Sequence, residues 1–194
     1  MRKLVAVLVF GLLCTACGSQ TQQAVSGPGT TTKRGFVLKP PVVAPAFALR
    51  HQDGRLAGPS RMHGHWFVVA FLYTHCPDVC PVIASNLGVA LRRLPDLRVL
   101  AISVDPKGDT PASVKTFLRS HNLPSRFRYV TGTRAELAPV WARYHVAATA
   151  GPKPIVSHSA FELLVDPQGR ERVLYDAQVQ ASDVARDVSA LAGG

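Results

Sequence analysis

Residues 66–81 have the sequence WFVVAFLYTHCPDVCP, which joins a run of strand-forming residues to a pair of cysteines. All eight residues from Trp66 to Tyr73 are apolar or aromatic. This length and composition are typical of a β-strand buried on both faces. Pro81 has no amide proton and suits the first turn of a helix. The stretch therefore predicts a buried strand, a short loop with Cys76 and Cys80, and then a helix over residues 82–93.

Outward from this stretch, strands and helices alternate. A second buried strand is predicted over 97–104, and a short one over 127–130. Strands over 159–165 and 171–175 flank a turn at 166–169. Helices are predicted from a cap at Asp109 or Thr110 to about 120, from a cap at Thr133 to near 144, and from a cap at Ser182 onward. A turn signal at 52–55 predicts a small hairpin. This order predicts an α/β fold, a central mixed sheet flanked by helices, compatible with a thioredoxin-like domain.

The composition excludes several protein classes. The chain has 194 residues, of which 47% are hydrophobic and 18% charged, so disorder along its whole length is excluded. The net charge of +10 would permit nucleic-acid binding. The basic residues are scattered, with no run of five or six, so we expect an arginine-rich solvated surface and no nucleic-acid partner.

The N-terminus has the layout of an export signal. Arg2 and Lys3 precede an apolar stretch over residues 4–13, which is shorter than the roughly 20 residues a membrane-spanning helix needs. Residues 13–17, LCTAC, resemble a bacterial lipoprotein processing site, in which Cys17 would become the lipid-bearing first residue. Ordinary cleavage after Ala16 is the alternative. We predict a signal over 1–17, a flexible tether over 18–42 and a folded domain over 43–194, anchored by lipid to the outer face of the cytoplasmic membrane.

The folded domain retains only two cysteines, Cys76 and Cys80, in the loop after the first buried strand. Open α/β sheets place their sites at such loops. Cys80 precedes a proline, which predicts that it caps the helix and that the helix dipole lowers the pKa of its thiol. We therefore expect two accessible, ionisable thiols. They could form a disulfide or bind a soft metal, and a metal would need a third ligand from elsewhere.

His158 is the histidine best placed to supply that ligand. It lies in a loop before the strand over 159–165, and in a thioredoxin-like layout this loop faces the cysteine loop. Taken alone, a single loop histidine is more often structural than functional.

Four stretches in order resemble the motifs of the Sco/SenC family. They are FLYTHCPDVCP at 71–81, SVDPKGDTP at 103–111, TGT at 131–133, and HSAF at 158–161 followed by VDPQG at 165–169. Members of this family are membrane-tethered extracytoplasmic copper proteins with a thioredoxin-like fold. The resemblance spans about residues 43–192.

The resemblance implies that Cys76, Cys80 and His158 bind one copper ion, Cu(I) or Cu(II). It implies a metallochaperone that takes copper from a donor protein, rather than an enzyme. The metal would go to the dinuclear copper site of cytochrome c oxidase subunit II or to another acceptor, or the protein would reduce that site's cysteines. Family members often carry aspartate immediately before the ligand histidine, whereas this chain has Ser157, so weaker Cu(II) binding is expected.

Two enzymatic alternatives remain. The first is a thiol–disulfide oxidoreductase that uses the Cys76/Cys80 pair, although three intervening residues differ from the two of an ordinary thioredoxin motif. The second is a peroxide-reducing enzyme, which ranks last because the sequence around Cys76 lacks a Thr-x-x-Cys arrangement.

Overall fold

A computed structural model describes residues 35–150, 156–158 and 160–193, and its centre is a six-stranded sheet. The strand order is β1-β10-β9-β4-β5-β6. β4, β5 and β6 are parallel to one another. β9 runs antiparallel to β4, β10 runs antiparallel to β9, and β1 runs antiparallel to β10. The strands are β1 (Gly35–Val43), β4 (Phe67–Leu72), β5 (Arg98–Ser103), β6 (Phe127–Val130), β9 (Phe161–Val165) and β10 (Arg170–Asp176).

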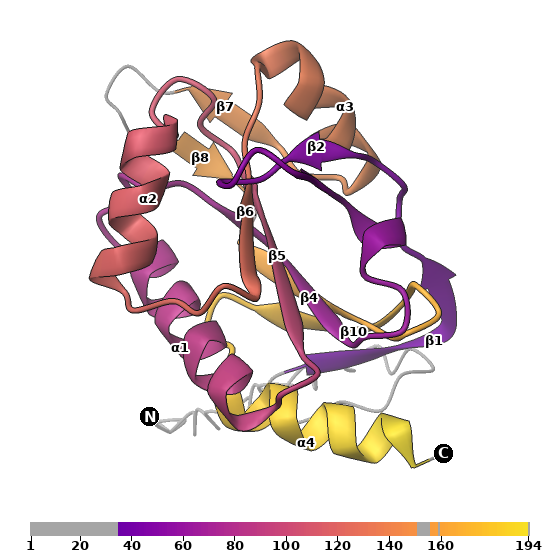
Figure 1. Ribbon diagram of the computed structural model, residues 1–194. Coiled ribbons are helices and arrows are strands. Elements are labelled where there is room, and N and C mark those ends of the chain that lie inside the picture. The colour runs from indigo at the N-terminus through magenta and orange to yellow at the C-terminus, as the bar shows by residue number, and fades with distance from the viewer. Residues whose placement is uncertain (1–34, 151–155, 159, 194) are drawn as a thin grey trace, which may run out of the picture.

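Four α-helices cover the sheet. They are α1 (Val79–Arg93), α2 (Pro111–Ser120), α3 (Arg134–Arg143) and α4 (Ala181–Ala192). α1 and α4 pack against each other on one face, and α3 lies on the opposite side of the sheet (Figure 1). The predicted α/β fold, a thioredoxin-like mixed sheet flanked by helices, is confirmed.

Four short strands and a helical turn lie outside the main sheet. β2 (Leu49–Arg50) and β3 (Leu56–Ala57) form the predicted small hairpin, and the 3-10 turn η1 (Pro59–Arg61) follows it. β7 (Ala148–Ala150) and β8 (Val156–His158) form a second hairpin. Here the prediction was wrong, because His158 was expected in a loop and its backbone lies on a strand.

The helix starts show which local signals were reliable. The side chains of Thr110 and Thr133 accept hydrogen bonds from the amides of Ser113 and Glu136, so both are helix caps as predicted. The cap of α4 is Gln180, not Ser182, since the helix starts at Ala181. The Gln180 backbone amide donates to the Asp183 carboxylate at 3.1 Å across the first turn.

The boundary between tether and domain also needs correction. Residue 42 was predicted as the end of the tether, yet Gly35–Val43 pair with β10 as an edge strand of the main sheet. The folded domain thus starts at or before Gly35. The predicted signal, the lipidation site Cys17 and the rest of the tether lie outside the described residues.

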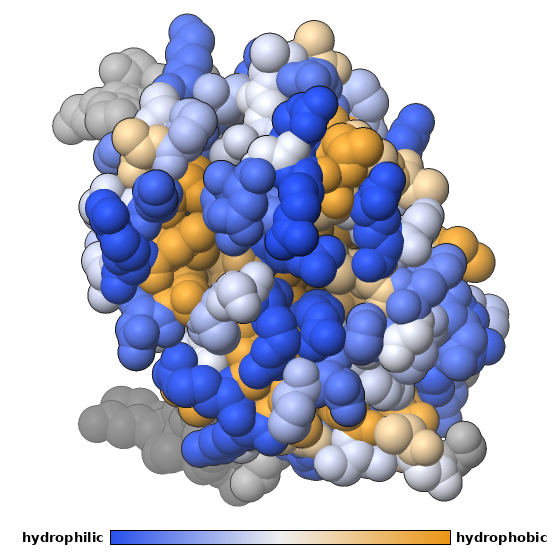
Figure 2. Space-filling view, viewed as in Figure 1, coloured by the Kyte–Doolittle hydropathy of each residue, from blue (hydrophilic) through white to orange (hydrophobic). Residues whose placement is uncertain are grey.

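The face seen in Figure 2 carries hydrophilic residues with apolar patches between them. Within residues 35–150, 156–158 and 160–193, no helix has both the length and the apolar character needed to cross a bilayer.

Glu162 of β9 is a buried acid without a partner. Its side chain is fully buried, opposite Tyr175 and Ala70, and neither carboxylate oxygen has a hydrogen-bond partner among the described residues. Burial, and then the nearby charge of Asp176, raise the pKa of Glu162 well above the ordinary 4.5. The folded protein therefore holds this proton when the unfolded chain has released it.

We expect Glu162→Gln to stabilise the protein at neutral pH. The folded-state pKa is raised, so the wild-type protein loses stability as the pH rises above the unfolded-state value, whereas an isosteric amide does not. The gain at pH 8 should be about 1–3 kcal/mol, shrinking toward pH 5. Urea unfolding at both pH values measures it, with the exposed Asp96→Asn as control. A variant no more stable than wild type at pH 8 would show that this acid costs nothing.

Candidate metal centre

Cys76 lies on the loop between β4 and α1, and Cys80 follows it at the start of α1. The Cys76 amide donates to the Tyr73 carbonyl oxygen at 3.3 Å, which turns the chain as it leaves the strand. α1 begins at Val79, so Cys80 lies in the first helical turn, and its amide donates to the Cys76 sulfur at 3.4 Å. The sulfur at the positive end of the helix is therefore that of Cys76.

This arrangement corrects the predicted roles of the thiols. Cys80 is not the cap, since Asp78 holds that position and Pro81 is the third helical residue. The first-turn amides of a helix have no intrahelical acceptor, so proline fits the third position as well as the first. The expected effect of the helix end on a thiol falls on Cys76 instead.

The two sulfurs are chemically unequal. Hydrogen bonds from the Cys80 thiol, from backbone amides of Cys80 and Asp78, and from Tyr73 outweigh burial and lower the pKa of Cys76 to about 5. The same thiol hydrogen bond and burial raise the pKa of Cys80. Cys80 is 0% exposed, whereas Cys76 is partly exposed. The prediction of two accessible thiols was thus wrong for Cys80. The site has a partly exposed thiolate, Cys76, and a buried thiol, Cys80.

Both cysteines are free, so the pair is in its reduced form. Two sulfur donors in one loop, one of them already ionised, form half of a site for a soft ion such as Cu(I). The donor chemistry therefore fits copper.

Asp109 holds this loop in place, a role that no sequence pattern predicts. Asp109 is buried and accepts hydrogen bonds from the Thr74 amide and hydroxyl, both at 2.8 Å. It also accepts from the hydroxyls of Ser103 at 2.6 Å and Tyr129 at 2.9 Å. The sequence predicts Asp109 or Thr110 as a helix cap, and the structure gives that role to Thr110. Asp109 is instead an anchor that ties the loop two residues before Cys76 to β5 and β6.

The described residues complete only part of the predicted ligand set. Among them, no group of three His, Cys, Asp or Glu side chains comes together to hold a metal. His158 is described by its backbone alone, opposite Ala148 in the β7–β8 hairpin, so the position of its imidazole stays a prediction. The side chain of Ser157 is likewise outside the description.

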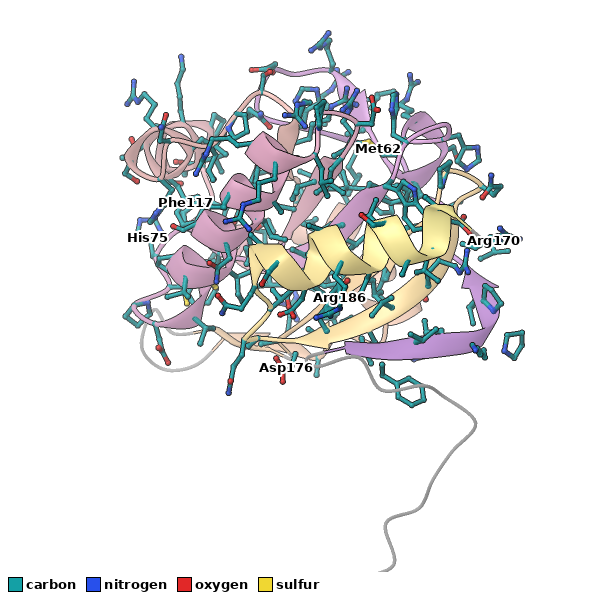
Figure 3. All side chains as sticks on the ribbon, turned by 90° about the horizontal axis from the view of Figure 1, so that it is seen from below. Met62, His75, Phe117, Arg170, Asp176 and Arg186 are labelled. Atoms are coloured by element: carbon teal, nitrogen blue, oxygen red, sulfur yellow. The ribbon has the colours of Figure 1, made fainter. Side chains whose placement is uncertain are left out.

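His75 adjoins Cys76 but lines a different feature. With α2 it borders an open hollow of about 440 Å³, whose lining includes Phe117. Figure 3 shows His75 and Phe117 near each other at this edge of the molecule. We therefore do not include His75 in the ligand set.

The sequence that forms this site matches a known protein family. The profile described as SCO1/SenC matches residues 38–193. This chain belongs to the SCO1/SenC family. The family resemblance inferred from the motifs is confirmed over more than the predicted span.

Individual relatives agree. The mitochondrial SCO2 homolog of Bos taurus is 31% identical over 153 residues, 73% of this chain and 57% of that protein. This chain thus spans little more than half of that SCO relative. The structure of Bradyrhizobium japonicum ScoI with copper bound is 29% identical, with a TM-score of 0.67 over 76% of this chain and 98% of that one. A SCO1/SenC family lipoprotein from Bacillus anthracis str. Ames shares the fold, with a TM-score of 0.72 at 23% identity over 80% of this chain and 99% of that one.

Proposed function

We propose that this SCO1/SenC protein binds one copper ion outside the cytoplasm and serves the assembly of the dinuclear copper site of cytochrome c oxidase. The observation that carries the proposal is the pair of free, unequal sulfurs Cys76 and Cys80 on a loop with the family's motif. The copper-bound Bradyrhizobium relative supports copper as the cargo. The export signal predicted over residues 1–17 and lipidation of Cys17 would hold the domain at the outer face of the cytoplasmic membrane.

In this proposal His158 is the third ligand. The residue after Ala160 is Phe161, whose ring lies 5.5 Å from that of Phe71 in β4. β4 leads directly into the cysteine loop, so the chain that carries His158 reaches the same end of the sheet as the sulfurs. Two thiolates and one imidazole suit Cu(I). Since Cys76 is already ionised at neutral pH, uptake of the ion would release mainly the Cys80 proton.

A second candidate function, thiol–disulfide exchange, is favoured by the low pKa of Cys76. The Cys76 thiolate would attack a partner disulfide, form a mixed disulfide and release one partner thiolate. The Cys80 thiol would then lose its proton, attack the Cys76 sulfur and release the second partner thiolate. The protein would be oxidised and the partner reduced by two electrons. This reaction needs both cysteines and has no role for His158.

The test is to count copper on single-residue variants. Reduced protein is mixed with Cu(I) and a competing chelator without oxygen. We expect one copper per wild-type chain and none on Cys76→Ser or Cys80→Ser. His158→Ala should weaken affinity by about tenfold or more, because one of three ligands is lost.

The exposed His63→Ala is the matched control and should bind like wild type. Equal affinities of wild type and His158→Ala would remove the imidazole from the site. If the protein then also reduced a protein disulfide, exchange would replace copper transfer as its function.

A further inference from the structure

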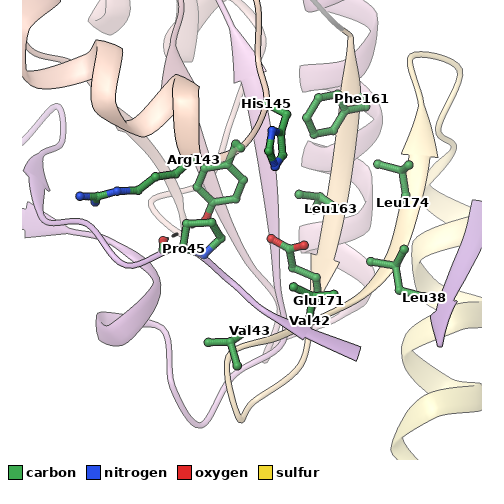
Figure 4. Close-up of a pocket in the computed structure, with 11 residues that line it drawn as sticks. Leu38, Val42, Val43, Pro45, Arg143, His145, Phe161, Leu163, Glu171 and Leu174 are labelled. Atoms are coloured by element: carbon green, nitrogen blue, oxygen red, sulfur yellow. Dashed lines mark hydrogen bonds between the residues drawn. The ribbon is translucent and has the colours of Figure 1, made fainter. Parts of the chain in front are cut away.

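An open apolar groove lies on the face of the sheet that carries α3, beyond the C-terminal end of that helix. It encloses about 450 Å³ between β1, β9 and β10. Its walls include Leu38, Val42, Leu163 and Leu174, with Phe161 at one end (Figure 4). This volume and lining are typical of a binding site rather than of a packing defect.

The groove is exposed where a monomer would ordinarily bury apolar side chains. Leu174 is 37% exposed and Val42 is 53% exposed. Phe36 and Val43 on the same edge strand are also exposed. Contiguous apolar surface of this kind marks an interaction site.

One carboxylate interrupts the apolar lining. Glu171 projects into the groove beside Leu163 and Val42 (Figure 4), and it has no hydrogen bond or ion pair among the described residues. Burial raises its pKa to about 7. The nearby Arg143 does not neutralise it, since that guanidinium points away from the groove and donates to the Ala46 carbonyl oxygen at 2.8 Å.

We propose that this groove binds a segment of a partner protein in which one lysine or arginine lies between apolar side chains. The walls would bury the apolar side chains, and the cation would pair with the Glu171 carboxylate, which has no ion pair among the described residues. An anionic lipid surface is a poor match because it would repel that carboxylate.

Two basic residues, Lys33 and Arg34, precede β1 in the sequence at the end of the strand away from Glu171. Lys33 and Arg34 directly precede Gly35, which pairs with Tyr175, whereas Val42 at the other end of β1 pairs with Glu171. At about 3.3 Å per residue, these positions on β1 lie roughly 20 Å apart. To reach Glu171 from that end, the chain before Gly35 would have to turn back along β1. A partner segment has no such constraint.

Three acetylated pentapeptides test the proposal, with lysine, norleucine or glutamate at the centre of flanking leucines and valines. Each is titrated into the full chain while methyl resonances of Leu163 and Leu174 are followed by NMR. We expect the lysine peptide to bind about fivefold tighter than the norleucine peptide and the glutamate peptide to bind weakest. Glu171→Gln should reduce the lysine preference to about onefold, whereas Leu174→Ser should weaken all three peptides.

The exposed Asp96→Asn serves as the charge-matched control and should keep the lysine preference. Equal affinities of lysine and norleucine peptides for wild type, or no methyl shifts at saturation of solubility, would overturn the proposal. Methyl shifts caused by Lys33→Ser and Arg34→Ser without peptide would also overturn it, because they would show that the chain itself occupies the groove.

Discussion

Iodoacetamide is expected to label Cys76 of the reduced, metal-free protein at least about a hundredfold faster than Cys80 at pH 7. Cys76 is partly exposed and its pKa is lowered to about 5, while Cys80 is fully buried and its pKa is raised. Only the thiolate reacts, so accessibility and ionisation favour the same sulfur. Mass spectrometry of timed, quenched samples gives the two rates.

The pH dependence provides a sharper measurement. The Cys76 rate should stay nearly constant from about pH 8 to pH 6 and fall about tenfold per pH unit well below pH 5, because the thiolate fraction follows the pKa. Cys80→Ala removes the thiol that donates to Cys76 and should move the profile toward higher pH. A wild-type rate that still rises tenfold between pH 7 and pH 8 would show that Cys76 has an ordinary pKa.

Asp109→Ala is expected to lower the free energy of unfolding by about 3 kcal/mol or more. The change leaves donors from Thr74, Ser103 and Tyr129 without their acceptor, two of them deep in the protein. It also frees the chain two residues before Cys76. Urea unfolding of the reduced protein measures the loss.

The control for this variant is Asp78→Ala in the same loop. Asp78 is exposed and its side chain makes no capping hydrogen bond, so its loss should change stability by less than about 0.5 kcal/mol. If Asp109→Ala and Asp78→Ala unfold at the same urea concentration, the buried carboxylate does not anchor the loop.

The sequence predicted best those features that depend on short-range patterns. The apolar runs predicted β4 and β5 to within one residue at each end, because a strand buried on both faces leaves no room for polar residues. Thr110 and Thr133 were found as caps because each hydroxyl satisfies an amide three residues away. The family motifs then located both cysteines.

Features that depend on distant contacts could not be predicted from patterns. The β7–β8 hairpin has strands of three residues, too short for an apolar period. The difference between the two thiols depends on where α1 starts. Pro81 fits the first or the third position of a helix, so the sequence leaves that start open by two residues. Asp109 is an anchor because Thr74 and Tyr129, 35 and 20 residues away in sequence, fold against it.

Because Cys76 is partly exposed and Cys80 is buried, ligands must reach the two sulfurs in a fixed order. An approaching ion or disulfide can touch only the outer sulfur of Cys76 first, since Cys80 has no contact with solvent. A departing ion that is bound to both sulfurs must break from Cys80 before it leaves Cys76. Transfer of an ion to another molecule therefore proceeds from one side and in two steps, so the outer sulfur can still hold the ion when a receiving ligand makes contact.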